Sequence, residues 1–535
     1  MKSIVAILLL FTFISAAAQN NYISKAWVAD NGDGTYKNPI INADYSDPDV
    51  IRVGDNFYLI SSSFNHVPGI PVLQSKDLVN WTIIGHVLPK LVPYDHFSRP
   101  QHGNGVWAPS IRYHNNEFYI YYPDPDFGIY VVKSKTIQGP WSDPVLVQAG
   151  KGLIDPCPLW DDDGKVYLVH AFAGSRAGIK SILVIKRLNA NGTKILDDGV
   201  LVYDGHEHDP TVEGPKIYKR NGYYYIFAPA GGVRTGWQLV LRSNNIYGPY
   251  ERKVVMDQGT TTINGPHQGA WVTTQTGEDW FIHFQDKNAY GRVVYLEPMR
   301  WINDWPVIGI DKEGDGKGEP ALVFKKPNTG KKYPIETPRE SDEFNESKLG
   351  LQWQWQANSK LTWSFLSGKS LRLYSYKIPD SAKNYWDVPN ILTQKFPAEK
   401  FTVTTKCNFI PRLAGENTGL IIMGKDYASL VLTKKQDSIY LAYVECKNAD
   451  MGNPEFEKMI EKVSSSVIYF RVTVSAGAKC QFSYSSDGIN FKNAGDIFTA
   501  QPGQWIGATL GIFCTRTSHT NDSGYADFDW FRVEK

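Results

Sequence analysis

Three carboxylic side chains with similar local sequences are the best candidates for chemistry in this chain. Asp47 and Asp155 each precede a proline, and Glu213 lies in a Glu-Gly-Pro sequence. A pair of carboxyl groups can divide the work of hydrolysing a glycosidic bond, because one donates a proton while the other activates water or attacks carbon. Taken singly, each motif is more typical of a turn. The case for chemistry therefore depends on where the fold places them.

The positions of these carboxylates follow an internal repeat. A strand rich in aromatic and aliphatic residues recurs roughly every 48 to 61 residues, near Phe57, Phe118, Val166, Tyr224 and Trp280. This spacing is close to that of propeller blades. About 10 to 13 residues before each of these strands, where the innermost strand of a blade would begin, lie Asp47, Trp107, Asp155, Glu213 and His267 in turn. Because innermost strands line one central channel, we expect these five side chains to converge.

We therefore expect an all-β chain, with a five-bladed β-propeller followed by a C-terminal β-sandwich. Residues 1–18 have a charged start, a short apolar run and an Ala-x-Ala end, which predicts a secretory signal peptide. The propeller is expected over residues 19–325. A linker rich in Lys, Pro and Gly is expected over 326–340, and a concanavalin A-like sandwich of short strands over 341–535.

Composition limits the class of partner. Aromatic residues make up 13% of the chain and the formal net charge is +1, so the basic excess typical of nucleic-acid binding is missing. This balance suits an uncharged oligosaccharide or polysaccharide. No stretch after the signal is apolar enough for a membrane helix, so we expect no membrane insertion and a periplasmic or secreted protein. The five cysteines predict buried free thiols, with one disulfide in the second half as an open alternative.

Four motifs together resemble glycoside hydrolase family 43, and the second half resembles the concanavalin A-like domain that often follows its propeller. The motifs are Asp47-Pro48-Asp49, Ile154-Asp155-Pro156, Glu213-Gly214-Pro215 and Gly265-Pro266-His267-Gln268-Gly269. The resemblance implies that Asp47 is the general base, that Glu213 is the general acid, and that Asp155 modulates the pKa of that acid and orients it. The implied reaction inverts the anomeric centre. Cys157 departs from the family pattern, where many relatives have Ser. It replaces none of the three carboxylates but could alter the shape of the pocket, so the resemblance defines the mechanism more closely than the substrate.

Further side chains are expected around the substrate. Trp107 would stack on a sugar face at the channel mouth. Arg292 resembles an arginine that reaches sugar hydroxyls in relatives, and Phe64 and His66 would wall the terminal-sugar pocket. For these residues an ordinary core or surface role is an equal alternative. His267 resembles a histidine that contacts a cation or water, so a structural cation near it is an option, although no cofactor is expected to be required.

The expected activity is exo-acting, inverting release of non-reducing terminal α-L-arabinofuranose from side chains of plant cell-wall polysaccharides such as arabinoxylan or xyloglucan. A β-xylosidase, or dual activity, is the first alternative, because the two sugars present similar hydroxyl geometry. A non-catalytic carbohydrate-binding propeller and a retaining, fructan-cleaving propeller are further alternatives. Whether the sandwich itself binds sugar stays open at this level.

Overall fold

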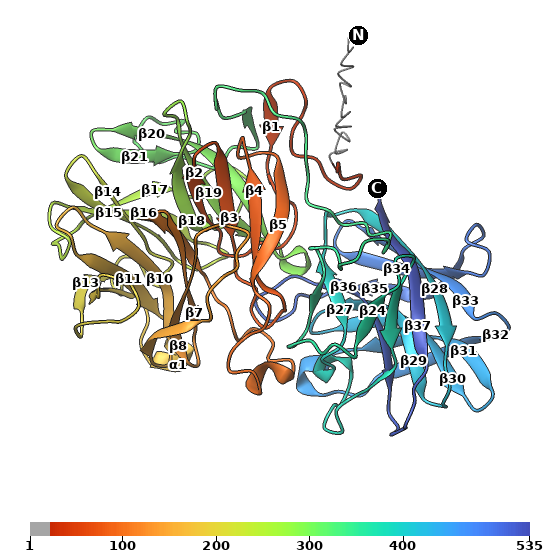
Figure 1. Ribbon diagram of the computed structural model, residues 1–535. Helices are drawn as coiled ribbons and strands as arrows, with labels where there is room; N and C mark the ends of the chain where they lie inside the picture. The colour runs from red at the N-terminus through yellow and green to blue at the C-terminus, as the bar shows by residue number, and fades with distance from the viewer. Residues whose placement is uncertain (1–21) are drawn as a thin grey trace, which may run out of the picture.

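The computed structural model describes residues 22–535 as two β domains that lie side by side (Figure 1). The predicted signal peptide falls outside the described residues. A five-bladed β-propeller forms the first domain and a β-sandwich the second, as predicted. Within residues 22–535, the one α-helix is the single turn α1 (Gly174–Ala177), and no helix is long and apolar enough to cross a membrane.

Each propeller blade is a four-stranded antiparallel sheet whose strands follow one another in sequence. The blades are β2 to β5 (Asp49–Val53, Asn56–Ile60, Gly69–Ser75, Trp81–Leu88), β6 to β9 (Ser110–His114, Glu117–Asp124, Gly128–Ser134, Val145–Ala149), β10 to β13 (Leu153–Trp160, Val166–Phe172, Ile182–Leu188, Val200–Asp204), β14 to β17 (Lys216–Arg220, Tyr223–Ala230, Trp237–Ser243, Glu251–Met256) and β18 to β21 (His267–Thr273, Asp279–Asp286, Arg292–Ile302, Trp305–Ile308). The repeated aromatic segments form the second strand of every blade. Their apolar side chains fill the space between neighbouring sheets, as Phe57, Leu59 and Ile282 do between the first and last blades.

Hydrogen bonds between the two ends of the propeller sequence close the ring. The segment before the first blade runs beside β20 of the last blade, where Ile41 and Val294 exchange backbone hydrogen bonds of 3.3 and 3.0 Å. The Tyr45 N–H donates to the Arg292 carbonyl at 3.0 Å. Strands β1 (Thr35–Lys37) and β22 (Val323–Lys325) pair further out. This closure brings Asp44 and Asp47 next to Arg292.

The second domain packs two antiparallel sheets over a large apolar core. One sheet runs in the order β23, β27, β36, β29, β30, β31, β32 (Gln354–Trp355, Leu392–Lys395, Thr509–Arg516, Glu416–Met423, Tyr427–Lys435, Ser438–Cys446, Phe456–Val463), with β26 (Tyr376–Lys377) beside β36. The other runs β24, β25, β37, β28, β33, β34, β35 (Ser364–Leu366, Leu371–Tyr374, Tyr525–Glu534, Phe401–Ile410, Val467–Ser475, Lys479–Ser485, Lys492–Thr499). All five cysteines are buried and free, so the disulfide considered for this half is not formed.

The two domains are joined by backbone pairing as well as by the linker. Val67 and Trp355 exchange backbone hydrogen bonds of 2.9 and 2.7 Å, and the Asn65 amide donates to the Gln356 carbonyl at 2.5 Å. The sandwich loop before β36 also reaches the propeller, where the Ala508 N–H donates to the Ala289 carbonyl at 2.7 Å. The propeller residues in these contacts lie in the loops β3–β4 and β19–β20, which join the second and third strands of the first and last blades. One edge of the sandwich is therefore fixed against these loops.

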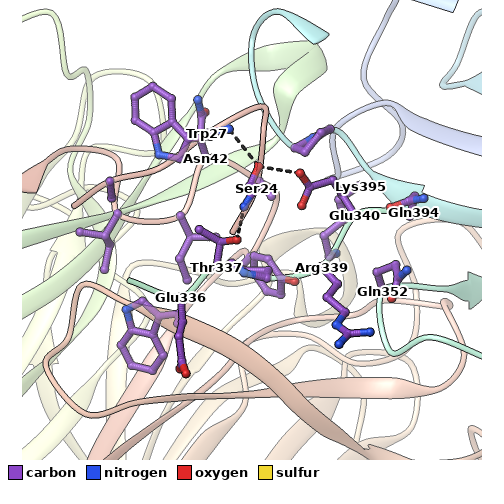
Figure 2. A pocket seen from close by; sticks show the side chains of 18 of the residues that line it. Ser24, Trp27, Asn42, Glu336, Thr337, Arg339, Glu340, Gln352, Gln394 and Lys395 are labelled. Atoms are coloured by element: carbon purple, nitrogen blue, oxygen red, sulfur yellow. Dashed lines mark hydrogen bonds between the residues drawn. The ribbon is translucent and has the colours of Figure 1, made fainter. Parts of the chain in front are cut away.

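A small cavity of about 60 Å³ lies where the first residues, the linker and the sandwich meet (Figure 2). The Ser24 hydroxyl donates to Glu340 at 2.5 Å, and the Ser24 N–H donates to the Thr337 hydroxyl at 2.7 Å. Burial raises the pKa of Glu340 to about 7. None of the three candidate carboxylates lines this cavity, so it belongs to the domain junction.

Candidate active site

The predicted carboxylates lie together at the starts of the innermost strands. Asp47 precedes β2, Asp155 lies near the start of β10, and Glu213 precedes β14. The charges of both Glu213 and Asp47 act on Asp155, and the Gly214 N–H donates to an Asp155 oxygen at 2.7 Å. The structure therefore brings together three acidic residues that are 58 to 166 positions apart in sequence. The result agrees with the convergence predicted from the repeat.

Backbone geometry sets the directions of the two aspartates. Asp47 has φ of 55° and Asp155 has φ of 57°, both in the left-handed region that is unfavourable for residues other than glycine. Each is followed by a proline, which restricts the residue before it further. Such strained positions are most often retained at functional sites. We infer that both Asp-Pro pairs re-aim a carboxylate toward the central channel instead of serving as ordinary turns.

Asp47 is surrounded by hydrogen-bond donors and a cation. The hydroxyls of Ser46 and Ser62 donate to Asp47 Oδ2 at 2.7 and 2.6 Å. Arg292 Nη1 lies 3.4 Å from Asp47 Oδ1 and donates to the Ser46 hydroxyl at 2.9 Å. These groups stabilise negative charge on Asp47. A buried carboxyl group held by fixed donors is suited to accept a proton from water.

Asp155 has the opposite environment. Its side chain is buried, and burial together with the charge of Glu213 raises the pKa of Asp155 to about 8. The hydrogen bond from the Gly214 N–H opposes this shift only in part. Asp155 therefore retains its proton at neutral pH.

Glu213 is the most accessible of the three carboxyl groups. Its side chain is 25% exposed, and Oε1 lies 2.9 Å from Nε2 of the fully buried His267. With the Nε2 tautomer protonated, this imidazole donates to Glu213 and fixes its orientation. An accessible, oriented carboxyl group beside a proton-retaining partner can protonate a leaving oxygen.

This arrangement agrees with the match to known families. Residues 36–306 match the family model described as glycosyl hydrolases family 43. The chain belongs to glycosyl hydrolase family 43. Residues 341–534 match the model of the beta xylosidase C-terminal concanavalin A-like domain. The family predicted from four short motifs is thus confirmed for both domains.

Relatives of this family-43 chain align along most of its length. A putative beta-xylosidase of Xylanibacter ruminicola is 39% identical, over 92% of this chain and 88% of the relative. A beta-xylosidase of Formosa agariphila is 35% identical, over 94% and 91%. A non-reducing end alpha-L-arabinofuranosidase of Bacteroides ovatus is 28% identical, over 93% and 94%. A crystal structure of a GH43 protein from Bacillus licheniformis has a TM-score of 0.79 at 27% identity, covering 94% of this chain and 99% of that one.

In this family-43 chain, two tryptophans from different domains contact each other near Arg292. Trp107 of the propeller and Trp505 of the sandwich lie edge to face, with ring centroids 6.1 Å apart. Trp505 is 44% exposed and also lies 6.0 Å from the Arg292 guanidinium. On the opposite side Arg176 lies 5.3 Å from the Trp107 ring. Stacking of Trp107 on a sugar stays a prediction, and Trp505 and Arg176 were not predicted, because the local sequence of each carries no sign of the site.

Close backbone approach holds the Trp505 loop against the propeller. A Cβ on Gly103 would lie 2.4 Å from Gln504 Cγ, and a Cβ on Gly507 would lie 2.5 Å from the Gly291 nitrogen. The buried Asp44 carboxylate accepts the N–H of Arg292 and the N–H of Gly507, each at 2.9 Å. Asp44 therefore links the propeller loop that carries Arg292 to the sandwich loop that carries Trp505.

Phe64 and His66 lie behind Asp47, next to the sandwich. They line a space of about 10 Å³ together with Ser46, Ser62 and other residues of both domains. Burial, with the nearby positive charges of Lys395 and His102, lowers the pKa of His66 to about 3, so its imidazole is neutral. Both side chains are buried near Ser46 and Ser62, the two residues whose hydroxyls donate to Asp47. Their contact with a sugar stays a prediction.

Cys157 lies between inner strands. It is fully buried, and its sulfur accepts hydrogen bonds from Arg112 Nη2 at 2.7 Å and from the Ile217 N–H at 3.4 Å. Arg112 in turn pairs with Asp49 at 2.8 Å. The residue that departs from the family pattern thus contributes to packing between strands β10 and β14.

His267 is the residue for which a cation was considered. Its Nδ1 is buried and has no hydrogen-bond partner within residues 22–535, so it could serve as a ligand to a cation or to water. The same residues contain no group of three or more His, Cys, Asp or Glu side chains arranged to hold a metal ion. His267 would therefore be the lone side-chain ligand of this type, and a cation there stays a prediction.

Proposed function

We propose that this chain is an exo-acting, inverting glycosidase that removes a terminal pentose, with β-D-xylose as the first candidate. The observation that carries the mechanism is the contrast between the two ends of the site. Asp47 lies among two hydroxyls and a guanidinium, whereas Glu213 is accessible and lies beside the buried Asp155, whose pKa is raised. One end is suited to accept a proton and the other to donate one.

The reaction follows from these assignments. Asp47 accepts a proton from a water molecule, and the water oxygen attacks the anomeric carbon. The bond from that carbon to the glycosidic oxygen breaks as Glu213 gives its proton to the leaving oxygen. Asp155 raises the proton affinity of the pair and, through the Gly214 N–H, fixes the start of the segment that carries Glu213. Attack from the face opposite the leaving group inverts the anomeric centre.

The preference for xylose is supported by the relatives. The two relatives that are 39% and 35% identical carry beta-xylosidase names. This differs from the arabinofuranose preference expected from the sequence, which is not confirmed. Release of terminal α-L-arabinofuranose is the second candidate, favoured by the 28% identical arabinofuranosidase that aligns over nearly the whole chain.

Exo action is supported by the mouth of the site. Trp107 and Trp505 bring aromatic side chains of two domains together near Arg292, and we expect such walls to admit a chain end more readily than the middle of a polymer. Export from the cytoplasm is part of the proposal and depends on residues 1–18. Xylan-type or arabinan-type side chains outside the cell would then be the substrate.

Two assays test this function. The purified protein is compared on 4-nitrophenyl β-D-xylopyranoside and 4-nitrophenyl α-L-arabinofuranoside, and we expect the higher kcat/KM on the xyloside. NMR of the sugar first released from xylo-oligosaccharides should show the inverted anomer. A first-formed product with retained configuration would overturn the roles given to Asp47 and Glu213, and a higher kcat/KM on the arabinoside would favour the second candidate.

A further inference from the structure

We infer that an open cleft beside the catalytic pocket binds a carboxylate-bearing sugar branch of the substrate, which is an inference that rests on the proposed function. The cleft has a volume of about 210 Å³ and lies between the last two blades and the sandwich. We call it the Arg234 cleft. The lining residues used in the argument are Arg234, Asn288, Arg292, Lys425, Gln504 and Trp505.

The cleft is continuous with the catalytic site. Arg292 and Trp505 line it, and the same two residues lie beside Asp47 and across from Trp107. A sugar held at the three carboxylates would therefore have the Arg234 cleft at its side. At the ~30 Å³ that each water occupies in the liquid, the space holds about seven waters, which is the scale of one sugar residue.

Charge selects the chemical class of the ligand. The cleft is lined by three basic residues, Arg234, Arg292 and Lys425, and by one acidic residue, Asp286. Within residues 22–535, Arg234 is exposed and forms no ion pair, and Lys425 lies only at the 3.9 Å limit from Asp450. Two cations are thus available to an anion that enters the cleft.

Arg292 supplies an independent observation. This side chain is 8% exposed, and its Nε is buried without a hydrogen-bond partner in the described part of the chain. The nearest acidic group, Asp286, lies 3.9 Å from that nitrogen, too far for a hydrogen bond. A buried guanidinium N–H without an acceptor favours an oxygen-rich ligand in the cleft.

The remaining lining groups suit a sugar that carries the carboxylate. The amides of Gln504 and Asn288 can hydrogen-bond hydroxyls, and the half-exposed Trp505 ring offers a face for stacking. A small inorganic anion would use the cations but leave the amides and the ring without partners. A hexuronic acid attached to the terminal sugar or its neighbour uses all three kinds of contact.

The test compares a xylo-oligosaccharide that bears one glucuronic acid with the same compound after its carboxyl group has been reduced to an alcohol. Affinities are measured by calorimetry on the Glu213→Gln variant, which retains the binding surfaces but turns over slowly. We expect the acidic compound to bind about fivefold more tightly at low salt, because exposed ion pairs are each worth up to about 1 kcal/mol. The difference should shrink as salt is added.

Substitutions then assign the effect to the cleft. In the Arg234→Gln, Lys425→Gln double variant the two compounds should bind equally, whereas Arg234→Lys with Lys425→Arg should keep the preference. Lys492→Gln, at an exposed lysine on the sandwich strand β35, is the matched control and should also keep it. Circular dichroism of each variant checks the fold.

Three results would overturn the inference. They are equal binding of the acidic and reduced compounds by the unsubstituted cleft, a preference that survives the double variant, and displacement of the acidic compound by inorganic phosphate as effectively as by free glucuronate. Hydrolysis of the neutral, reduced compound by the native chain is followed in parallel. Failure of that reaction would contradict the proposed function, whereas failure of the binding comparison alone contradicts only this inference.

Discussion

Asp47 and Asp155 share one local structure but lie in different surroundings. Both precede a proline, both have left-handed backbone near φ 56°, and both are buried at the start of an innermost strand. They differ in their neighbours. Asp47 faces two hydroxyls and Arg292, whereas Asp155 faces Glu213 and a backbone N–H. Because the local geometry is the same, the difference between the two carboxyl groups comes from neighbours that the rest of the fold supplies.

The largest effect is expected from removing the charge at Asp47. Asp47→Asn keeps the size of the side chain, but the amide cannot accept a proton from water. We therefore expect kcat to fall by about 10⁴-fold, the upper end for loss of a general base. Steady-state kinetics on xylo-oligosaccharides measure this. Thermal unfolding of the variant serves as the control for folding. A kcat within tenfold of the native value would show that another group activates the water.

The acid is tested by its dependence on the leaving group. Glu213→Gln should lower kcat/KM on xylo-oligosaccharides by about 10³-fold, because a sugar hydroxyl needs protonation to leave. On a 4-nitrophenyl pentoside the loss should be much smaller, since nitrophenolate departs without a proton. Equal losses on the two substrates would argue against Glu213 as the proton donor.

The contrast between the two aspartates is sharpened by the pH profile. Burial and the charge of Glu213 raise the pKa of Asp155 to about 8, so Asp155 retains its proton below that pH and loses it as the pH rises through it. Activity of the native chain should therefore decline above about pH 8. Asp155→Asn removes this titrating group, which should lower kcat by about 10²-fold and move the alkaline limb away from pH 8. The kcat/KM profile from pH 5 to 10 measures the shift, and an alkaline limb that does not move contradicts the assignment.

A smaller effect is expected at the mouth. Trp505→Ala removes an aromatic wall supplied by the sandwich, so KM should rise about tenfold, equivalent to about 1.4 kcal/mol, with a smaller change in kcat. Trp530→Ala, on the other sheet of the same domain at the partly exposed strand β37, is the matched control and should leave KM unchanged. A kcat that falls while KM stays constant would place Trp505 in positioning and not in sugar contact.

The smallest effect is expected from removing metal ions. The proposed proton transfers use only side chains, so dialysis against EDTA should leave kcat unchanged. Thermal unfolding measured before and after dialysis reports separately on a structural cation at His267. A loss of activity that Ca²⁺ or Mg²⁺ restores would show that a cation takes part in the reaction.

Much of the propeller could be predicted because the repeat records it locally. The second strand of each blade has its own aromatic pattern, and the distance to the residue at the start of the preceding innermost strand is similar in every copy. The three carboxylates and His267 therefore converge as predicted. Ser62, Trp505 and Arg176 could not be found in this way. Each lies in a segment whose sequence is set by turns or packing, and its approach to the site depends on another blade or domain.

Substrate preference was the least predictable property. The motifs describe how the bond is broken, and these groups are common to enzymes that release different pentoses. The shape of the pocket depends on Trp107, Trp505 and the Arg234 cleft, which lie between elements. A preference for arabinose was expected from the sequence, whereas the names of the relatives that are 39% and 35% identical support the proposal of xylose.

Strand periodicity and repeat spacing are local properties of the chain, so the five blades, the second domain and the positions of the three acidic residues could be predicted without coordinates. The raised pKa of Asp155 and the approach of Trp505 to Arg292 could not be predicted in this way. Both depend on burial and on neighbours that are distant in sequence but close in space. Arg292 is 245 residues from Asp47, and Trp505 comes from another domain.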